Sequence, residues 1–234
     1  MARVFPNGLS GSAIKGAAVV CMAIDHAAFA FVPTLSGLGI LLHVIGRMTA
    51  PCMCFFIAEG CAHTRNPKRY ALRLGVFALL SWPCFSYFET GRFFAPEFGM
   101  LYSLFFALLA VLACEKLPGL PLKILAVAAC CLATEWGDWH YFAVLYAVAF
   151  WAGRGDFRKQ ALLFCGVSLL MLAVYTGGSL PYIVMNLGVF LALPLLAAYN
   201  GRRGGEGHPW LSKWGFYLFY PAHLLLLGVF KGLV

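Results

Sequence analysis

The sequence predicts an all-α fold, a polytopic bundle of membrane-spanning helices that forms one domain over residues 1–234. Hydrophobic residues make up 62% of the chain and charged residues only 11%, and the mean hydropathy is +0.83. Apolar runs of about twenty residues, long enough to cross a bilayer as a helix, follow one another along the chain. This pattern leaves no room for a separate soluble domain.

The helices are placed in order from these runs. The first holds Lys15, Asp25 and His26, and the second holds Pro51, whose missing N–H predicts a kink in mid-span. The fifth and sixth are short, and Gly137 predicts a tight hairpin between them. A glycine-rich linker at 201–209 precedes the last helix. The nine predicted helices cover residues 13–32, 38–62, 70–90, 98–115, 120–135, 139–153, 160–177, 181–199 and 212–232.

The distribution of positive charge supports this map. If the N-terminus is cytoplasmic, fourteen of the 17 Lys and Arg residues fall in inside segments, while only Arg92 and Lys231 fall outside. Arg47 remains within the membrane. Cytoplasmic loops carry the excess of Lys and Arg in membrane proteins. The sequence therefore predicts nine transmembrane helices with the N-terminus cytoplasmic and the C-terminus outside.

The first helix carries the most informative stretch, KGAAVVCMAIDH, from Lys15 to His26. An offset of eleven residues returns almost to the same side of a helix, about 16 Å further along its axis. Charged side chains within the membrane are costly and by default mark a functional site. The alternative is that Lys15 reaches the interface while Asp25 and His26 only hold helices together.

Arg47 in the second helix lies at a depth similar to that of Asp25 and His26. A buried arginine needs a counter-ion, so an Asp25–Arg47 pair beside His26 is expected. The same pair could equally be a purely structural one.

A second polar level is expected toward the cytoplasm, where a Lys15–Glu59 pair is plausible and His63 is close by. The loop after it, HTRNPKRYALR, is a basic patch. Its residues Arg65, Lys68 and Arg69 are suited to phosphate groups. The alternative is an orientation signal beside anionic lipid.

Two further regions contain candidate residues. The last helix holds FYLFYPAHLLLL, in which His223 follows Tyr220 and Pro221 at mid-membrane depth and could meet His26 in one cavity. The alternative is a histidine that only donates a hydrogen bond to a carbonyl of a neighbouring helix. The outside hairpin EWGDWHYF places Asp138 and His140 among interfacial aromatics, where acidic groups could receive an amine.

Several function classes are disfavoured. The chain lacks the motifs GxSxG, Walker A, HExxH and the dinucleotide glycine pattern, which are typical of common hydrolases, P-loop enzymes and zinc proteases. Its nine cysteines lack the paired CxxC spacing of a metal site, so no metal is expected. The net charge of +8 is explained by membrane orientation and does not predict nucleic-acid binding.

Three stretches resemble the TraX family: IKGAAVVCMAIDH, then HVIGRMTAPCMCFFIAEGCAHTRNPKRYALRLGVFALLSWPCF, and finally WGFYLFYPAHLLLL. The founding member of this family is associated with N-terminal acetylation of F-type pilin. The wider resemblance is to transmembrane acyltransferases, which have a basic residue and a histidine separated by ten residues in the first helix, as Lys15 and His26 are.

The resemblance implies an acetyltransferase of the bacterial inner membrane, with acetyl-CoA as donor, membrane lipids around it and an amine or hydroxyl acceptor such as a pilin N-terminus. His26 is the expected base, since imidazole titrates near neutrality. Asp25 would orient the ring or neutralise Arg47, and Arg47 would stabilise the oxyanion or hold the acceptor. An acetyl-His26 intermediate is equally consistent with these residues.

Two other functions fit the same sequence. The buried charges could form a proton or substrate relay in a transporter, although no inverted repeat is evident. The chain could also be a noncatalytic assembly factor for a pilus. His26→Ala separates the three functions.

Overall fold

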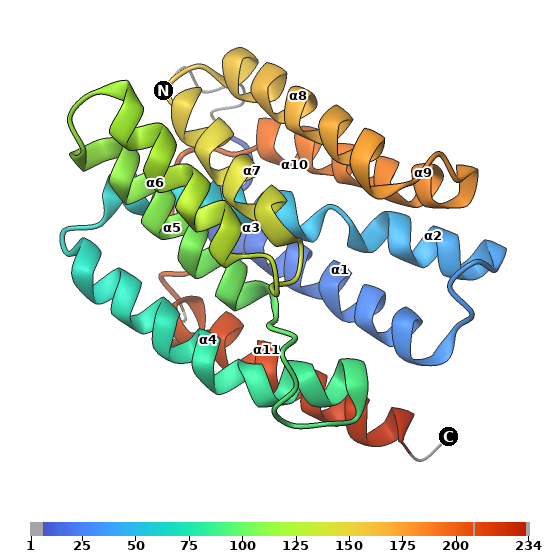
Figure 1. Ribbon diagram of the computed structural model, residues 1–234. Coiled ribbons are helices and arrows are strands. Elements are labelled where there is room, and N and C mark those ends of the chain that lie inside the picture. Colours follow the sequence, from blue (N-terminus) through green and yellow to red (C-terminus); the bar gives the residue numbers. More distant parts are fainter. Residues whose placement is uncertain (1–6, 208, 233–234) are drawn as a thin grey trace.

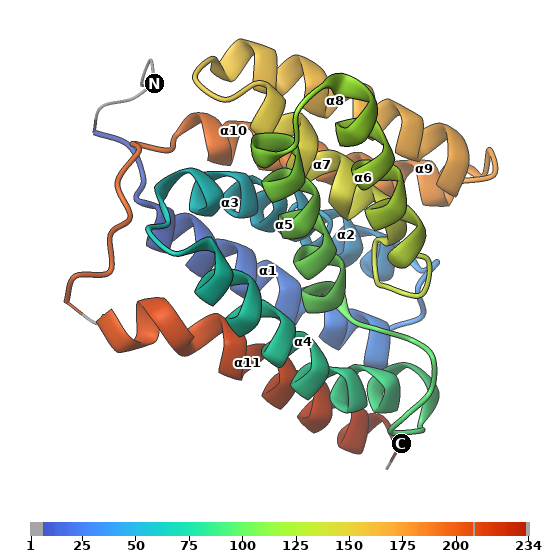
Figure 2. The ribbon, with the colours of Figure 1, turned by 60° about the vertical axis from the view of Figure 1, so that its left-hand side comes forward.

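The computed structural model describes residues 7–207 and 209–232, in which the regular elements are helices. Arg3, one of the charges counted inside, lies outside the described residues. Figure 1 shows the helices gathered into one bundle that begins with α1 (Gly11–Phe31) and ends with α11 (Pro209–Lys231). α11 packs against α4 (Pro67–Thr90) along one side of the bundle, and both also lie beside α1 in Figure 2.

The second predicted helix is divided into α2 (Gly37–Gly46) and α3 (Thr49–His63). Arg47 and Met48 form the turn between them. Pro51 has no N–H to donate to the Arg47 carbonyl, and a proline ring clashes with the carbonyl four residues before it. The break predicted from Pro51 is therefore confirmed, and it falls at Arg47.

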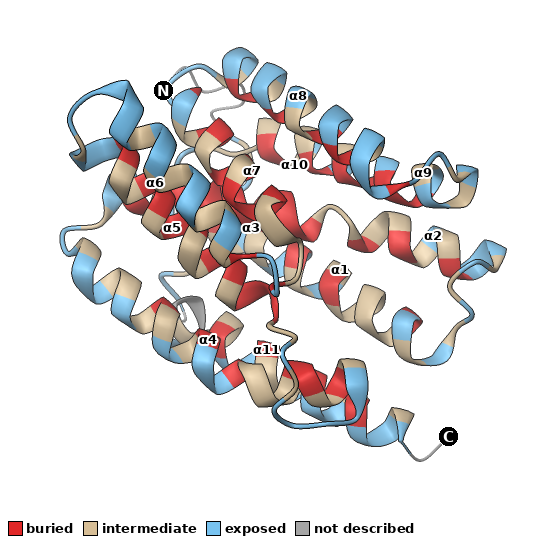
Figure 3. Ribbon diagram, viewed as in Figure 1, coloured by how far each residue is buried: buried red, intermediate tan, exposed pale blue. Residues whose placement is uncertain are grey.

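α3 forms the centre of the bundle, because almost all of its side chains are buried (Figure 3). It packs against α1, α5 (Met100–Lys116) and α7 (His140–Ala152). By contrast α6 (Leu120–Ala133) has no buried residue and covers the outside of α5 and α7. Glu59, a polar residue predicted on α3, is thereby buried, whereas His63 at the end of this helix is exposed.

The remaining helices follow the predicted order. α8 (Phe157–Tyr175) packs against α7, and the next apolar run is split into α9 (Leu180–Leu187), a 3-10 segment η1 (Gly188–Leu191) and α10 (Ala192–Ala197). The loop after α10 returns to the start of α1, where the amides of Gly11 and Ser12 donate to the carbonyls of Arg202 and Arg203, each at 2.8 Å.

The surface of the bundle is that of a membrane protein. Exposed leucines and valines such as Val20, Leu79 and Leu162 stand on the outer faces of α1, α4 and α8. Within the described residues, five helical stretches are long and apolar enough to cross a membrane, namely 11–31, 37–63, 67–90, 157–175 and 180–197. Nine crossings with the N-terminus inside remain a prediction from the charge distribution.

This topology can be tested with reporter fusions. Alkaline phosphatase, which is active only outside the inner membrane, should be active when fused after Phe94 or Trp136 and inactive after Pro118 or Gly205. A cytoplasmic fluorescent reporter should give the reverse pattern at the same four positions. An inactive phosphatase with an active fluorescent reporter in the loop after α4 or in the loop after α6 would contradict the predicted orientation.

Candidate functional site

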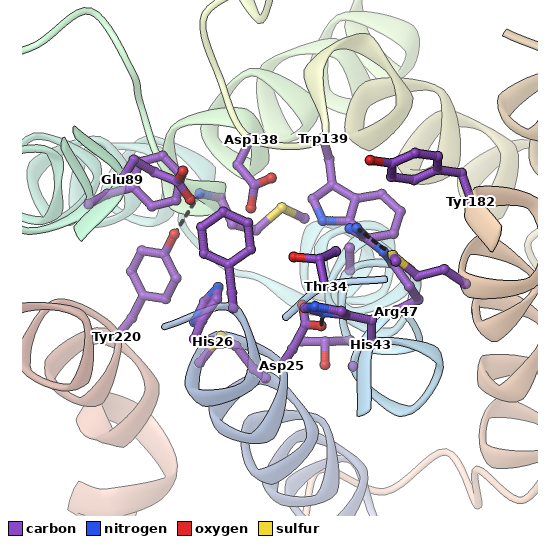
Figure 4. Close-up of a pocket in the computed structure, with 18 residues that line it drawn as sticks. Asp25, His26, Thr34, His43, Arg47, Glu89, Asp138, Trp139, Tyr182 and Tyr220 are labelled. Atoms are coloured by element: carbon purple, nitrogen blue, oxygen red, sulfur yellow. Dashed lines mark hydrogen bonds and ion pairs between the residues drawn. The ribbon is translucent and has the colours of Figure 1, made fainter. Parts of the chain in front are cut away.

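A cavity of about 380 Å³ opens where the Phe31 end of α1 meets α2, α4 and the loop before α7. We call it the chamber. Figure 4 shows polar and aromatic side chains turned toward it from opposite walls. Five residues predicted from the sequence line it, together with five others that were not singled out: Asp25, His26, Arg47, Asp138 and Tyr220, with Thr34, His43, Glu89, Trp139 and Tyr182.

Asp25 pairs with His43, which the sequence analysis did not identify. Its Oδ1 atom lies 2.7 Å from Nδ1 of His43, whose side chain is almost fully buried. Nε2 of His43 is buried without a hydrogen-bond partner. Gly46 makes this pairing possible, because a Cβ atom there would overlap the Asp25 carboxylate.

The predicted Asp25–Arg47 ion pair is wrong. The guanidinium of Arg47 lies 5.5 Å from the Trp139 ring centre, and its Nη2 atom lies 3.8 Å from the sulfur of Met185. Its Nε atom is buried without a hydrogen-bond partner. No carboxylate of the described residues lies within 4.0 Å of this guanidinium, because His43 has taken the oxygen expected for it. The Arg47 guanidinium therefore lines the chamber without an ion pair to any described carboxylate.

His26 and His223 meet, as the positions of the two residues in the sequence suggested. Nδ1 of His26 lies 2.8 Å from Nε2 of His223 across the contact between α1 and α11. Nδ1 of His223 lies 2.8 Å from the carbonyl of Phe219, one turn earlier on its own helix. The expected meeting with His26 is confirmed, but His223 does not line the chamber, and the carbonyl that it contacts belongs to its own helix and not to a neighbouring one.

The hairpin before α7 supplies Asp138 and Trp139. The backbone N–H of Asp138 donates to Phe98 at 2.7 Å, and the Asp138 carbonyl accepts from the Ser103 hydroxyl. Burial raises the pKa of the Asp138 carboxyl to about 6, although the Arg47 guanidinium opposes this shift. The charge of the chamber therefore changes near neutral pH.

Backbone strain accompanies the Arg47 contact. Trp139 and His140 have φ angles of 63° and 42°, which L-residues rarely adopt. Such strain persists where the surrounding structure enforces it, often at functional sites. His140, however, is not among the residues lining the chamber, and its Nδ1 lies 2.7 Å from the Glu135 carbonyl. Asp138 therefore lines the chamber and His140 does not, so the two predicted residues do not form one site.

Tyr220 has a structural contact as well as a place in the chamber wall. Its hydroxyl accepts the backbone N–H of Met100 at 2.7 Å, which ties α11 to the first residue of α5. Glu89, which stands beside it in Figure 4, comes from the last turn of α4.

A second polar region lies near the start of α1. Nζ of Lys15 is 4.7 Å from the Phe56 ring centre, and Arg73 and Arg203 lie close enough to act on its charge. We call these three residues the cationic cluster. Nε of Arg73 lies 3.4 Å from the Tyr217 hydroxyl. Among the described residues no carboxylate is ion-paired with any of the three.

The predicted Lys15–Glu59 pair is wrong. Glu59 is buried, with His63 Nδ1 at 4.0 Å from its Oε2 atom, and this oxygen has no hydrogen-bond partner. His63 is largely exposed and bonds the Glu59 carbonyl.

Arg65, Lys68 and Arg69 are exposed around the start of α4. The residues near Lys15 are instead Arg73 and Arg203. Arg73 ends the predicted basic stretch HTRNPKRYALR but was not named as a candidate, and Arg203 was missed.

The missed residues differ in how visible they are in the sequence. His43 lies one turn before Arg47, at the depth of Asp25 across the turn joining α1 to α2, so helix geometry alone could have identified it. Arg73 lies one turn after Arg69 on the same helix. Arg203 comes from a distant loop, and no local pattern marks it. No group of three or more metal-ligating side chains with suitable geometry occurs in the described part of the chain.

The fold and the chamber together define a multi-helix membrane protein with a polar cavity inside its bundle. Comparison with known proteins makes the assignment more specific. The family profile described as TraX protein matches residues 10–231, and the chain belongs to this family. It is 31% identical over 228 residues to a protein of Dichelobacter nodosus named "Probable fimbrial assembly protein FimC, serogroup H1", covering 92% of each chain. No solved structure gives a significant match.

Replacing Gly46 by alanine should push Asp25 away from His43. Overpacking of a tight site costs about 1–3 kcal/mol, so the melting temperature in detergent should fall by several degrees. Gly16→Ala in α1 is the matched control, since no atom lies within 4 Å of its added Cβ. An alanine is more favourable than glycine in a helix, so this control should melt at the same temperature or slightly higher. Equal melting of the two variants would contradict the close approach at Gly46.

The pairing of Asp25 can be tested with two double-mutant cycles. Asp25→Asn and His43→Phe should be coupled by roughly 0.5–3 kcal/mol, because the residues are in contact. Asp25→Asn and Arg47→Met should be more nearly additive. Melting temperatures of the single and double variants provide the measurement. If Asp25→Asn were strongly coupled to Arg47→Met and not coupled to His43→Phe, the result would favour an Asp25–Arg47 ion pair and contradict the structure.

Proposed function

We propose that this protein is a membrane-bound acyltransferase that moves an acetyl group from acetyl-CoA to an amine or hydroxyl, in a pathway that builds a pilus. The observation that carries this proposal is the chamber, in which the imidazole of His26 and the guanidinium of Arg47 line one cavity within the bundle, with Arg47 in no ion pair among the described residues. Acyl transfer needs both a base and a positive group for the oxyanion.

The chemistry assigns one role to each group. His26 removes the proton from the acceptor as its nitrogen or oxygen attacks the thioester carbon. Arg47 stabilises the negative charge that develops on the carbonyl oxygen. The carbon–sulfur bond then breaks, and the proton held by His26 passes to the leaving thiolate. The products are an amide or an ester and a free thiol.

The cationic cluster is the proposed site for the phosphates of the donor. Lys15 and His26 are separated by eleven positions on α1, which is about 16 Å along the helix axis. A long, flexible acyl carrier bound by its phosphates at Lys15, Arg73 and Arg203 would extend its thioester toward the chamber. Under the predicted topology, the donor enters from the cytoplasm and the chamber lies toward the opposite side of the inner membrane.

The acceptor side of the chamber carries Glu89 and Asp138. Carboxylates in these positions attract an ammonium group on the acceptor, such as a pilin N-terminus, and one of them can take the proton that the ammonium must lose before its nitrogen attacks.

A noncatalytic role is the second candidate, because the curated relative is named as a probable fimbrial assembly protein. Such a protein would support assembly of the pilus without forming a covalent bond. It requires neither acetyl-CoA nor a base at position 26, so His26→Ala distinguishes the two functions.

Transfer of label from radioactive acetyl-CoA tests the proposal. Wild-type protein and His26→Ala, each in lipid vesicles with a membrane extract as acceptor source, are compared with Ser168→Ala, which changes a buried hydroxyl on α8 away from the chamber. Label should appear with the wild type and Ser168→Ala and fall at least a hundredfold with His26→Ala, since general base catalysis contributes about 10²–10⁴. Absence of label and of acetyl-CoA binding with folded wild-type protein would favour the assembly role.

A further inference from the structure

We infer that His223 is a positioning residue, which holds His26 in the one tautomer that directs an unprotonated Nε2 atom into the chamber. The tautomer follows from the contacts of the two rings alone. Its importance for catalysis rests on the function proposed above.

The direction of each hydrogen bond is fixed by the carbonyl of Phe219. A carbonyl oxygen only accepts, so Nδ1 of His223 must carry the hydrogen in the 2.8 Å contact. A neutral imidazole has one N–H, which makes Nε2 of His223 an acceptor. The hydrogen between the two rings, also at 2.8 Å, must then belong to Nδ1 of His26. His26 is left with its lone pair on Nε2.

The contacts of His26 leave that lone pair available to the chamber. His26 lines the chamber, whereas His223 is not among the lining residues. Nε2 of His26 has no hydrogen bond to any other residue that the structure describes. The two rings are inclined by only 19°, and the Phe219 ring is nearly parallel to that of His223 at 4.7 Å between centres. These contacts restrain rotation of His223.

The arrangement resembles a catalytic histidine oriented by a second group, with a neutral imidazole in place of the usual carboxylate. When Nε2 of His26 takes a proton, the hydrogen bond from Nδ1 to His223 stabilises the imidazolium. Without this acceptor, a second tautomer with hydrogen on Nε2 becomes accessible, and that tautomer cannot remove a proton. Loss of His223 should therefore slow the chemical step more than it weakens binding.

Nitrogen NMR of the full-length protein with ¹⁵N-labelled histidine tests the tautomer directly. The His26 signals are assigned by their loss in His26→Ala, at a pH above the ordinary imidazole value of about 6.5. Wild-type protein should show hydrogen on Nδ1 of His26 and none on Nε2. The opposite tautomer, or an equal mixture, would overturn the inference whether or not the protein transfers acetyl groups.

Two variants of His223 separate positioning from folding. His223→Gln keeps an amide oxygen near the position of Nε2, whereas His223→Leu offers no acceptor. The leucine variant should show mixed His26 tautomers and a kcat lowered about ten- to a hundredfold with little change in KM, while glutamine restores most of both. Equal loss in both variants, with the His26 tautomer unchanged, would show that His223 only packs. A wild-type protein without transferase activity would overturn the proposed function and leave the NMR result to decide the tautomer.

Discussion

Hydrogen bonding in the absence of water is the constraint on which this structure depends. Lipid cannot bond a buried carboxylate or imidazole, so leaving such a group without a partner in the chain is costly. Asp25 finds His43 and His26 finds His223, and each contact joins two helices. The Asp25–His43 pair joins the consecutive helices α1 and α2, whereas the His26–His223 pair joins α1 to α11 at the other end of the chain. Because Asp25 pairs with His43, Arg47 makes no ion pair among the described residues.

The backbone is adapted to these pairs at particular residues. Pro51 ends α2 at Arg47, which gives the guanidinium its place between two helix segments, and Gly46 leaves space for the Asp25 carboxylate beside it. On the opposite wall, the positive φ angle of Trp139 accompanies its position over Arg47. The helix break at Arg47, the glycine at position 46 and the strained turn at Trp139 therefore all lie at the wall of the chamber.

The sequence predicted the helices well, because an apolar run of membrane length has few other structures open to it. It also placed His26 and Arg47 at one depth, since depth follows from counting residues along a helix, but it placed Asp138 at the outer interface and not in the same cavity. It did not predict their partners. Asp25 was matched to Arg47 by charge, yet His43 lies nearer, and the rotation of one helix against another decides between them. Arg203 was beyond prediction, because only the packing of the whole chain brings its loop to Lys15.

The unpaired groups bear on the choice between a catalytic site and a scaffold. Buried polar atoms without partners are rare in native proteins, and each one calls for an explanation. A protein that only supports assembly gains stability when such atoms are paired or replaced by apolar groups. Among the described residues, Arg47 Nε and His43 Nε2 are buried without partners in residues that line the chamber, while Glu59 Oε2, Glu97 Oε2 and Trp151 Nε1 are buried without partners elsewhere. A bound substrate or a developing charge could satisfy the two atoms at the chamber, and this supports the catalytic function proposed above.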